Sequence, residues 1–298
     1  MNHMLSILAR ASAVSVTRSP RHARARLLCT VPPPLVKISA DEINPKLKII
    51  TLNSPKNLNA MTVGLGDAFR EAVGQLASLP PSELRAVVLT GEGRAFSAGG
   101  DLTFLEDRRV ATPTSNALTM RAFYERFLSV RSLPVPVVTN INGPAIGAGL
   151  CLAMGTDIRV THDKAKLGFT FVGLGLHPGM GCTHTIAANA GGQAAARLLL
   201  TGDVVSGAEA AAIGIVAASL PDADAARAEA LELARRVAAQ SPLAVRATLA
   251  TLRRSNGAGL DAALAREADA QAQSYASADY AEGLAALRDK HPPSFPGD

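Results

Sequence analysis

Two apolar runs, each followed closely by a glycine-rich turn, constrain the fold more than any other feature of the sequence. The run Leu84–Thr90 ends at Gly91, and the run Val135–Asn140 precedes the turn Gly143–Gly149. Largely apolar character over about 4–8 residues is typical of strands that are buried on both faces. Such strands belong to parallel sheets, and helices connect them. The sequence therefore predicts an α/β fold.

The segments around these runs alternate between strand-like and helical patterns. We expect a spiral of ββα turns over residues 32–220, with strands at Leu35–Ala40, Lys46–Leu52, Leu84–Thr90, Val135–Asn140 and Asp157–Val160 and helices at Met61–Ala77 and Ser115–Leu133. Residues 221–298 are Ala-rich and helical, with breaks near Pro242, Gly257 and Ala276. These helices cannot bury an apolar face alone. They should pack on the core or on another subunit, so we expect an oligomerisation section here.

Basic residues are concentrated at the start of the chain. The net charge is +5, and residues 1–31 hold five arginines and no acidic residue. The rest of the chain is neutral, which argues against a nucleic-acid-binding surface. A basic, Ser- and Ala-rich start is typical of an organellar transit peptide, so we expect mitochondrial import. A plastid address and a disordered basic tail are the alternatives, and no apolar run is long enough to span a membrane.

The two glycine-rich turns, residues 94–101 (RAFSAGGD) and 143–149 (GPAIGAG), can present free backbone N–H groups. Small residues let a substrate carbonyl approach the backbone, which suits stabilisation of an oxyanion, although purely structural turns are the alternative.

The sequence lacks the motifs of several other classes of enzyme. There is no phosphate-binding GxxxxGK[ST] loop, residues 173–175 lack the third glycine of a dinucleotide motif, and Ser97 is not in a nucleophile elbow. The Cys and His spacings predict no metal site and no disulfide framework.

Six ordered motifs resemble the crotonases, the enoyl-CoA hydratase/isomerase superfamily, over residues 35–298. They are SPKNLNAM at residues 54–61, FSAGGDL, NGPAIGAGLCLAMGTDIRV, AKLGF, PGMG after His177, and EGLAALRDKHPPSF in the tail. The resemblance implies an acyl-CoA substrate whose thioester carbonyl lies between two backbone N–H groups, which match Ala98 and Ala148. Coenzyme A would then be part of the substrate, with no cofactor bound permanently. The resemblance also implies a homotrimer or a dimer of trimers.

The sequence departs from this family at the two glutamates with which its hydratases hold and activate water. Their positions match Cys151 and Phe171, which we expect in the substrate pocket, and no glutamate occurs between Glu125 and Glu209. His177 and Asp101 are the remaining candidates for an acid or base, and structural hydrogen bonding or helix capping is the alternative for each.

Cys151 and Asp157 are each expected to have a structural role. Cys151 is a small apolar filler, and Asp157 is a cap or an ion pair close to Arg159. By resemblance, coenzyme A is expected to contact Lys56, Ala60, Gly99, Gly100 and Lys290.

Three functions follow from these observations. The first is a lyase or isomerase acting on fatty or branched acyl-CoA esters through a thioester enolate. The second keeps the enolate and changes the next step, for example by decarboxylating a malonyl-type thioester. The third is an acyl-CoA-binding subunit without catalysis. An exposed cation or hydrogen-bond donor opposite Ala98 would favour a carboxylated substrate, whereas Phe171 on an apolar wall would favour a plain acyl chain.

Overall fold

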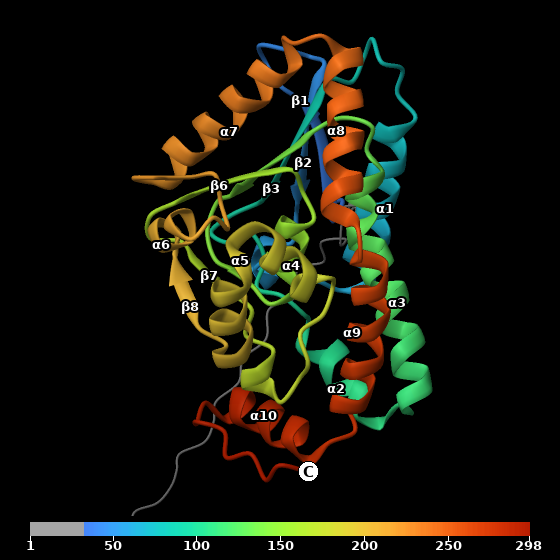
Figure 1. Cartoon of the computed structure of the whole chain (residues 1–298), viewed down its shortest axis with the longest axis vertical. Coiled ribbons are helices and arrows are strands. Elements are labelled where there is room, and N and C mark those ends of the chain that lie inside the picture. The colour runs from blue at the N-terminus through green and yellow to red at the C-terminus, as the bar shows by residue number, and fades with distance from the viewer. Residues whose placement is uncertain (1–32) are drawn as a thin grey trace, which may run out of the picture. The chain divides into compact units, whose positions relative to one another are not determined.

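A computed structural model describes residues 33–298, and the predicted transit peptide lies outside them. The main sheet has the strand order β1-β2-β3-β4-β6-β9, in which β1 is antiparallel to β2 and all other neighbours are parallel (Figure 1). A smaller sheet contains β5, β7 and β8. The strands are β1 (Val36–Ala40), β2 (Leu47–Leu52), β3 (Ala86–Gly91), β4 (Val137–Ile141), β5 (Ala145–Ile146), β6 (Ile158–His162), β7 (Lys166–Gly168), β8 (Val204–Ser206) and β9 (Ala218–Leu220).

Helices connect and cover these strands. They are α1 (Val63–Ala77), α2 (Leu102–Val110), α3 (Pro113–Leu128), α4 (Ala148–Met154), α5 (Cys182–Thr201), α6 (Gly207–Ala212), α7 (Ala223–Ala238), α8 (Pro242–Gly257), α9 (Leu260–Ser274) and α10 (Ala278–Asp289). Three short 3-10 helices are η1 (Pro55–Asn57), η2 (Ser129–Ser132) and η3 (Val172–Leu174).

The central strands of the main sheet, β3 and β4, are buried on both faces, as their apolar character predicts. In β3, Ala86 and Val88 face one side and pack with alanines of α7, whereas Val87 and Leu89 belong to the main core on the other side. This alternation follows from the two-residue period of a strand. Helix α7 therefore covers one face of the sheet, and the larger core with the site lies on the opposite face.

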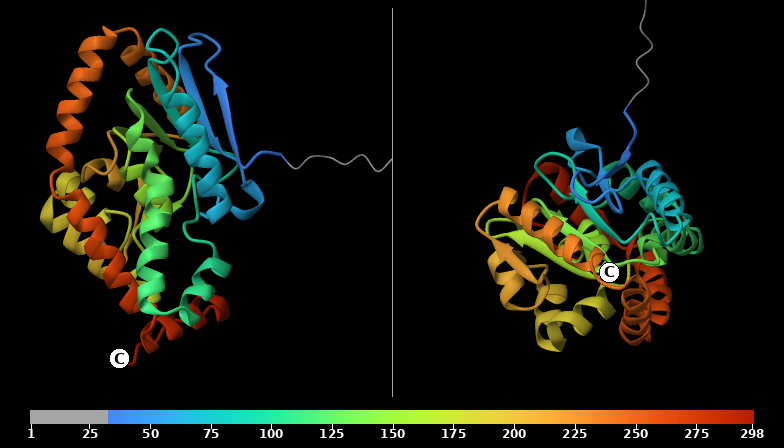
Figure 2. Two further views of the ribbon diagram at one scale, coloured as in Figure 1. Left: turned by 90° about the vertical axis from the view of Figure 1, so that its right-hand side faces the viewer. Right: turned by 90° about the horizontal axis from the view of Figure 1, so that it is seen from above.

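The C-terminal helices pack on the core of the same chain. Helix α9 lies along α3, and α10 lies beside η3 and α2 (Figure 2). Residues 34–298 form one compact unit. The predicted breaks near Pro242, Gly257 and Ala276 are confirmed, because helices end or begin at or beside each of them.

Each predicted strand is found within two residues of its predicted bounds. The sequence patterns did not predict α2, α6, β8 or β9, because these elements are short or lack a clear apolar period. The second glycine-rich segment also contains β5 and the start of α4 rather than being a turn throughout.

Asp157 has the structural role that we expected, but its partner is different. Its carboxylate pairs with Arg253 on α8, with Oδ2 2.7 Å from Nη2, and also accepts the backbone N–H of Val137 at 2.8 Å. Arg159 instead donates to two backbone carbonyls and to one side-chain amide oxygen. This ion pair ties the C-terminal helices to the start of β4 and β6.

Candidate active site

The two glycine-rich turns lie directly against each other. The N–H of Ile146 donates to the carbonyl of Ser97 at 3.0 Å. A methyl group added at Gly149 would lie 2.6 Å from the carbonyl oxygen of Ser97, and one added at Gly99 would lie 2.6 Å from that of Ile146. Only glycine allows this approach, because a real Cβ would clash with the opposite backbone. The glycines predicted to shape the site therefore bring two segments, about fifty residues apart in the chain, into contact.

Two backbone N–H groups in these turns are free to bind a ligand. Among residues 33–298, no protein acceptor lies within hydrogen-bond reach of the N–H of Gly100 or of Ala148. Ala148 is the first residue of α4, where an N–H has no partner within the helix. The predicted donor Ala98 is wrong, since its N–H already donates to the carbonyl of Leu58 at 2.9 Å. Its neighbour Gly99 donates to Oγ of Ser97 at 3.2 Å, which leaves Gly100 as the free donor of this turn.

Gly100 and Ala148 both line one cavity of about 480 Å³. Its wall is apolar, and within the described part of the chain no Asp, Glu, Lys, Arg, His or Cys side chain lines it. Phe171 lies on this wall, as predicted for the pocket. The lining residues are Ala98, Gly99, Gly100, Phe104, Leu105, Met120, Phe123, Tyr124, Ile146, Gly147, Ala148, Thr170, Phe171, Gly173, Leu174, Leu176, Gly179, Met180, Thr201, Gly202, Gln271, Tyr275 and Leu287.

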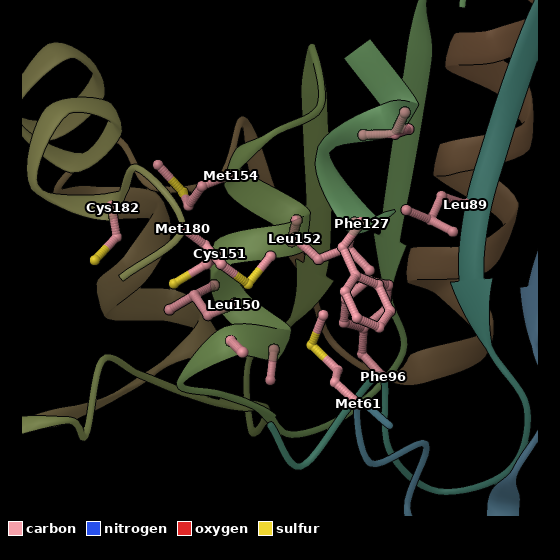
Figure 3. Packing of buried hydrophobic residues seen from close by; sticks show 14 of the residues in the cluster. Met61, Leu89, Phe96, Phe127, Leu150, Cys151, Leu152, Met154, Met180 and Cys182 are labelled. Carbon is pink, nitrogen blue, oxygen red and sulfur yellow. The ribbon is translucent and has the colours of Figure 1, made fainter. Parts of the chain in front are cut away.

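Cys151 does not line the cavity, so its predicted place in the substrate pocket is wrong. Cys151 is 1% exposed and packs in the main core with Leu150, Met180 and Cys182 (Figure 3). The alternative interpretation as an apolar filler is confirmed. Burial raises the pKa of the neighbouring thiol of Cys182, and the nearby Cys151 raises it further, so Cys182 is held as a neutral thiol.

His177 and Asp101 both have structural contacts instead of facing the cavity. The ring Nδ1 of His177 lies 2.6 Å from the carbonyl oxygen of Pro178, and the residue borders a separate open groove. The carboxylate of Asp101 caps α2 by accepting the N–H of Phe104 at 3.2 Å. For both residues the structure supports the simpler alternative, and neither lines the cavity as an acid or base.

The residues expected to contact coenzyme A lie around the first turn and at the end of α10. The segment 54–61 is held against the first turn because Met61 donates to the carbonyl of Gly99 at 2.7 Å. Lys56 and Lys290 are both exposed, and Leu287, three residues before Lys290, lines the cavity. The assignment of these residues to coenzyme A stays a prediction.

Sequence reasoning missed the polar pair on the cavity wall. Tyr124 on α3 donates its phenol proton to Oε1 of Gln271 on α9 at 2.7 Å, and Nε2 of Gln271 donates to the carbonyl of His177 at 2.9 Å. Burial raises the pKa of Tyr124 well above its usual range, so the phenol stays neutral. The two residues lie 147 positions apart, and no sequence spacing signals such a contact.

Glu267, one helical turn before Gln271, was also missed. Its buried carboxylate accepts the N–H groups of Gly181 and Thr183 and the hydroxyl of Thr183. These contacts cap the N-terminus of α5, where a negative charge is favourable. Desolvation raises the pKa of Glu267, although the hydrogen bonds from Thr183 and Gly181 oppose that shift. The residue fixes the loop that carries Gly179 and Met180 to the cavity.

The chain is similar over most of its length to known CoA-thioester hydratases. The profile described as Enoyl-CoA hydratase/isomerase matches residues 42–298. The chain is 30% identical over 253 residues to the 2,3-dehydroadipyl-CoA hydratase of Escherichia coli, an alignment that covers 85% of this chain and 96% of that one. It is 31% identical over 255 residues to the crotonyl-CoA hydratase of Syntrophomonas wolfei, which covers 84% and 94% of the two chains.

Solved structures show the same fold. A structure of an enoyl-CoA hydratase from Mycobacterium avium subsp. paratuberculosis superimposes with a TM-score of 0.76 at 27% identity, covering 88% of this chain and 98% of that one. The spiral of strands and helices is thus the crotonase fold. The match of the family profile to most of the chain shows that the protein belongs to the enoyl-CoA hydratase/isomerase family.

Residues 33–298 contain neither a membrane-spanning helix nor a cluster of potential metal ligands. No helix there is both long and apolar enough to cross a membrane. No three His, Cys, Asp or Glu side chains of this part of the chain gather in a way that could hold a metal ion.

Proposed function

We propose that this protein is a hydratase/isomerase-like enzyme that binds an acyl-CoA thioester with an uncharged acyl group and stabilises its enolate. The observation that carries the proposal is the pair of free N–H groups, of Gly100 and Ala148, on the wall of one apolar cavity. A thioester oxygen between two such donors gains about 2.7–4 kcal/mol from each as negative charge develops on it. The acyl chain then lies against the apolar wall that includes Phe171.

The cavity favours a plain acyl chain over a carboxylated one. A carboxylate in an apolar cavity needs a cation or several hydrogen-bond donors, because its desolvation is otherwise too unfavourable. No Lys, Arg or His of the described residues lines this cavity, and Phe171 lies on its wall. Decarboxylation of a malonyl-type thioester is therefore the weaker hypothesis.

The chemistry of proton transfer must differ from that of the two-glutamate hydratases that the sequence resembles. Phe171 occupies one matching position and Cys151, which is buried in the core, the other. General acid–base groups contribute about 10²–10⁴-fold each, so we expect hydration of an enoyl-CoA to be slow. Enolate formation or double-bond movement in a fatty or branched acyl-CoA adds no water and needs only one acceptor for the α-proton, and it is the reaction that we favour. No described lining residue is an acid or base that could take this proton, so water must accept it.

The remaining parts of the proposal concern assembly, location and coenzyme A. We propose that the protein acts in mitochondria, on the composition of residues 1–31, and that it assembles as a homotrimer or a dimer of trimers. Lys56, Ala60 and Lys290 would contact coenzyme A, which comes and goes with the substrate, so that no permanently bound cofactor is needed.

A panel of CoA thioesters tests this function. The purified protein is incubated with enoyl-, 3-hydroxyacyl-, saturated acyl- and malonyl-CoA in D₂O, and products and α-deuterium incorporation are followed by mass spectrometry. Conversion of, or exchange into, an uncharged thioester supports the proposal. Conversion of malonyl-CoA alone would replace it with the decarboxylase, and binding without any exchange would leave the non-catalytic binder.

A further inference from the structure

We propose that Tyr124 and Gln271 form a hydroxyl-binding site in the wall of the cavity, and that the acyl group of the substrate carries a hydroxyl that occupies it. This proposal rests on the proposed function and adds a feature of the acyl group. Both side chains line the cavity, although they come from different helices, α3 and α9.

The orientation of the Gln271 amide follows from its contacts. The carbonyl of His177 can only accept a hydrogen bond, so the amide nitrogen of Gln271 must face it, at 2.9 Å. The amide oxygen then faces Tyr124, 2.7 Å away, and must accept the phenol proton. Because burial keeps that phenol neutral, this direction of donation does not change with pH near neutrality.

Tyr124 and Gln271 can each form one more kind of hydrogen bond. The phenol oxygen of Tyr124 keeps its lone pairs as acceptors, and the amide nitrogen of Gln271 keeps its second hydrogen as a donor. Among the residues that the structure describes, neither capacity has a further protein partner. A hydroxyl group donates and accepts at once, so it can use both, whereas a carbonyl can only accept and an alkyl carbon can do neither.

Gly179 packs against this pair at the cavity wall. A methyl group added at Gly179 would lie 2.6 Å from the phenol oxygen of Tyr124 and 2.7 Å from Nε2 of Gln271. Gly179 also lines the cavity and packs directly against these two polar atoms, so only glycine fits at this position of the wall. Tyr124 and Gln271 line the same cavity, which places the polar pair at its wall.

The other polar side chains of the cavity are those of Thr170, Thr201 and Tyr275, and the last two are less suited to this role. The hydroxyl of Thr201 already bridges the carbonyl of Arg197 and the N–H of Asp203. The phenol of Tyr275 contacts Sδ of Met120 at 3.5 Å, without an amide partner. Tyr275 is therefore a matched control: a buried phenol in the same cavity that should not recognise a hydroxyl.

The test compares the affinities of related thioesters by isothermal titration calorimetry. The ligands are butanoyl- and hexanoyl-CoA, each unsubstituted, with a hydroxyl at C3, with a carbonyl at C3, and with a hydroxyl at the chain end. At one hydroxyl position the full-length protein should bind the hydroxy ester about 3- to 10-fold more tightly than the unsubstituted ester, the range expected of a neutral hydrogen bond. The 3-oxo ester should show less of this preference.

The variant Tyr124→Phe/Gln271→Leu removes both polar partners together. Such a paired replacement leaves neither side chain without its partner, but the carbonyl of His177 loses the donor Nε2 of Gln271, so some loss of stability is expected. The readout is the ratio of the affinities for the hydroxy and unsubstituted esters: the double variant should lose the hydroxyl preference, whereas Tyr275→Phe should keep it.

Three outcomes would overturn the inference: equal binding of hydroxy and unsubstituted esters by the unmodified protein, a preference that survives in the double variant, or a preference lost in Tyr275→Phe. Failure of every thioester to bind would instead count against the proposed function.

Discussion

The substitution Ala148→Pro removes one proposed oxyanion donor with little change in the fold. Ala148 is the first residue of α4, a position that proline tolerates because its fixed φ suits the helix and its N–H has no helical partner. The preceding Gly147 has φ 52° and ψ −123°, outside the α region that a following proline disfavours. No protein hydrogen bond within the described residues is lost.

The magnitudes separate the effect on catalysis from the effect on stability. Loss of one oxyanion donor lowers kcat by about 10²–10³-fold, or about 2.7–4 kcal/mol. Since no hydrogen bond is lost, we expect the free energy of unfolding to change by less than about 1 kcal/mol, which is about 2–4 °C in Tm for a chain of this size. The control Ala148→Gly keeps the N–H and is destabilised by up to about 1 kcal/mol. It should retain most of the activity.

Two assays test whether the N–H of Ala148 acts as an oxyanion donor. Turnover is measured on the best substrate of the thioester panel, and the absorption of a bound cinnamoyl-type CoA thioester reports how strongly its carbonyl is polarised. Ala148→Pro should abolish most of the shift to longer wavelength that the unmodified protein causes, and Ala148→Gly should keep it. A folded Ala148→Pro protein with at least a third of the original rate, or with an unchanged absorption shift, would refute the assignment of this N–H.

Three further changes test the supporting structure. Gly149→Ala should destabilise the fold by about 3 kcal/mol in chemical denaturation and abolish activity, because the new Cβ would lie 2.6 Å from the carbonyl of Ser97 and force the turns apart; full activity would contradict the close contact. Arg253→Met should lower the free energy of unfolding by about 3 kcal/mol by leaving Asp157 unpaired, and adding Asp157→Asn should restore part of it; a single variant as stable as the original would count against the ion pair. Glu267→Gln tests a pH effect: the raised pKa of Glu267 means that the folded state holds the proton more tightly, so this residue's contribution to stability falls as pH rises from about 4.5 through the folded-state pKa. The difference in Tm between the original protein and Glu267→Gln should therefore decrease across that range, and a difference that grew with pH would show that the sign is wrong.

The sequence predicted the sheet well because its strands carry their own signal. Runs such as Leu84–Thr90 are largely apolar, and burial on both faces is the state that such a run favours. The glycine-rich turns were placed correctly for a related reason, since two close backbone approaches require glycine at Gly99 and Gly149.

The sequence could not predict which backbone N–H groups of the glycine-rich turns are free to bind a ligand. Whether Ala98 or Gly100 offers a free N–H depends on where the carbonyl of Leu58 lies, which is set by a segment about forty residues earlier in the chain. The same limit applies to Tyr124 and Gln271, whose contact arises only when α9 packs along α3. Apolar periodicity places a helix but does not fix its partner.

The apolar cavity also determines how the rate should depend on pH. Tyr124 and Tyr275 are the titratable side chains among its described lining residues, and burial raises the pKa of both phenols, so neither ionises near neutrality. Two backbone N–H groups can stabilise an enolate by about 5–8 kcal/mol together, but they neither gain nor lose a proton with pH. A reaction that depends on them should therefore have a kcat that is constant between about pH 6 and 9, without the bell shape that a catalytic acid and base produce. A clear inflection in kcat within this range would show that an ionisable group outside the cavity wall reaches the substrate in the complex.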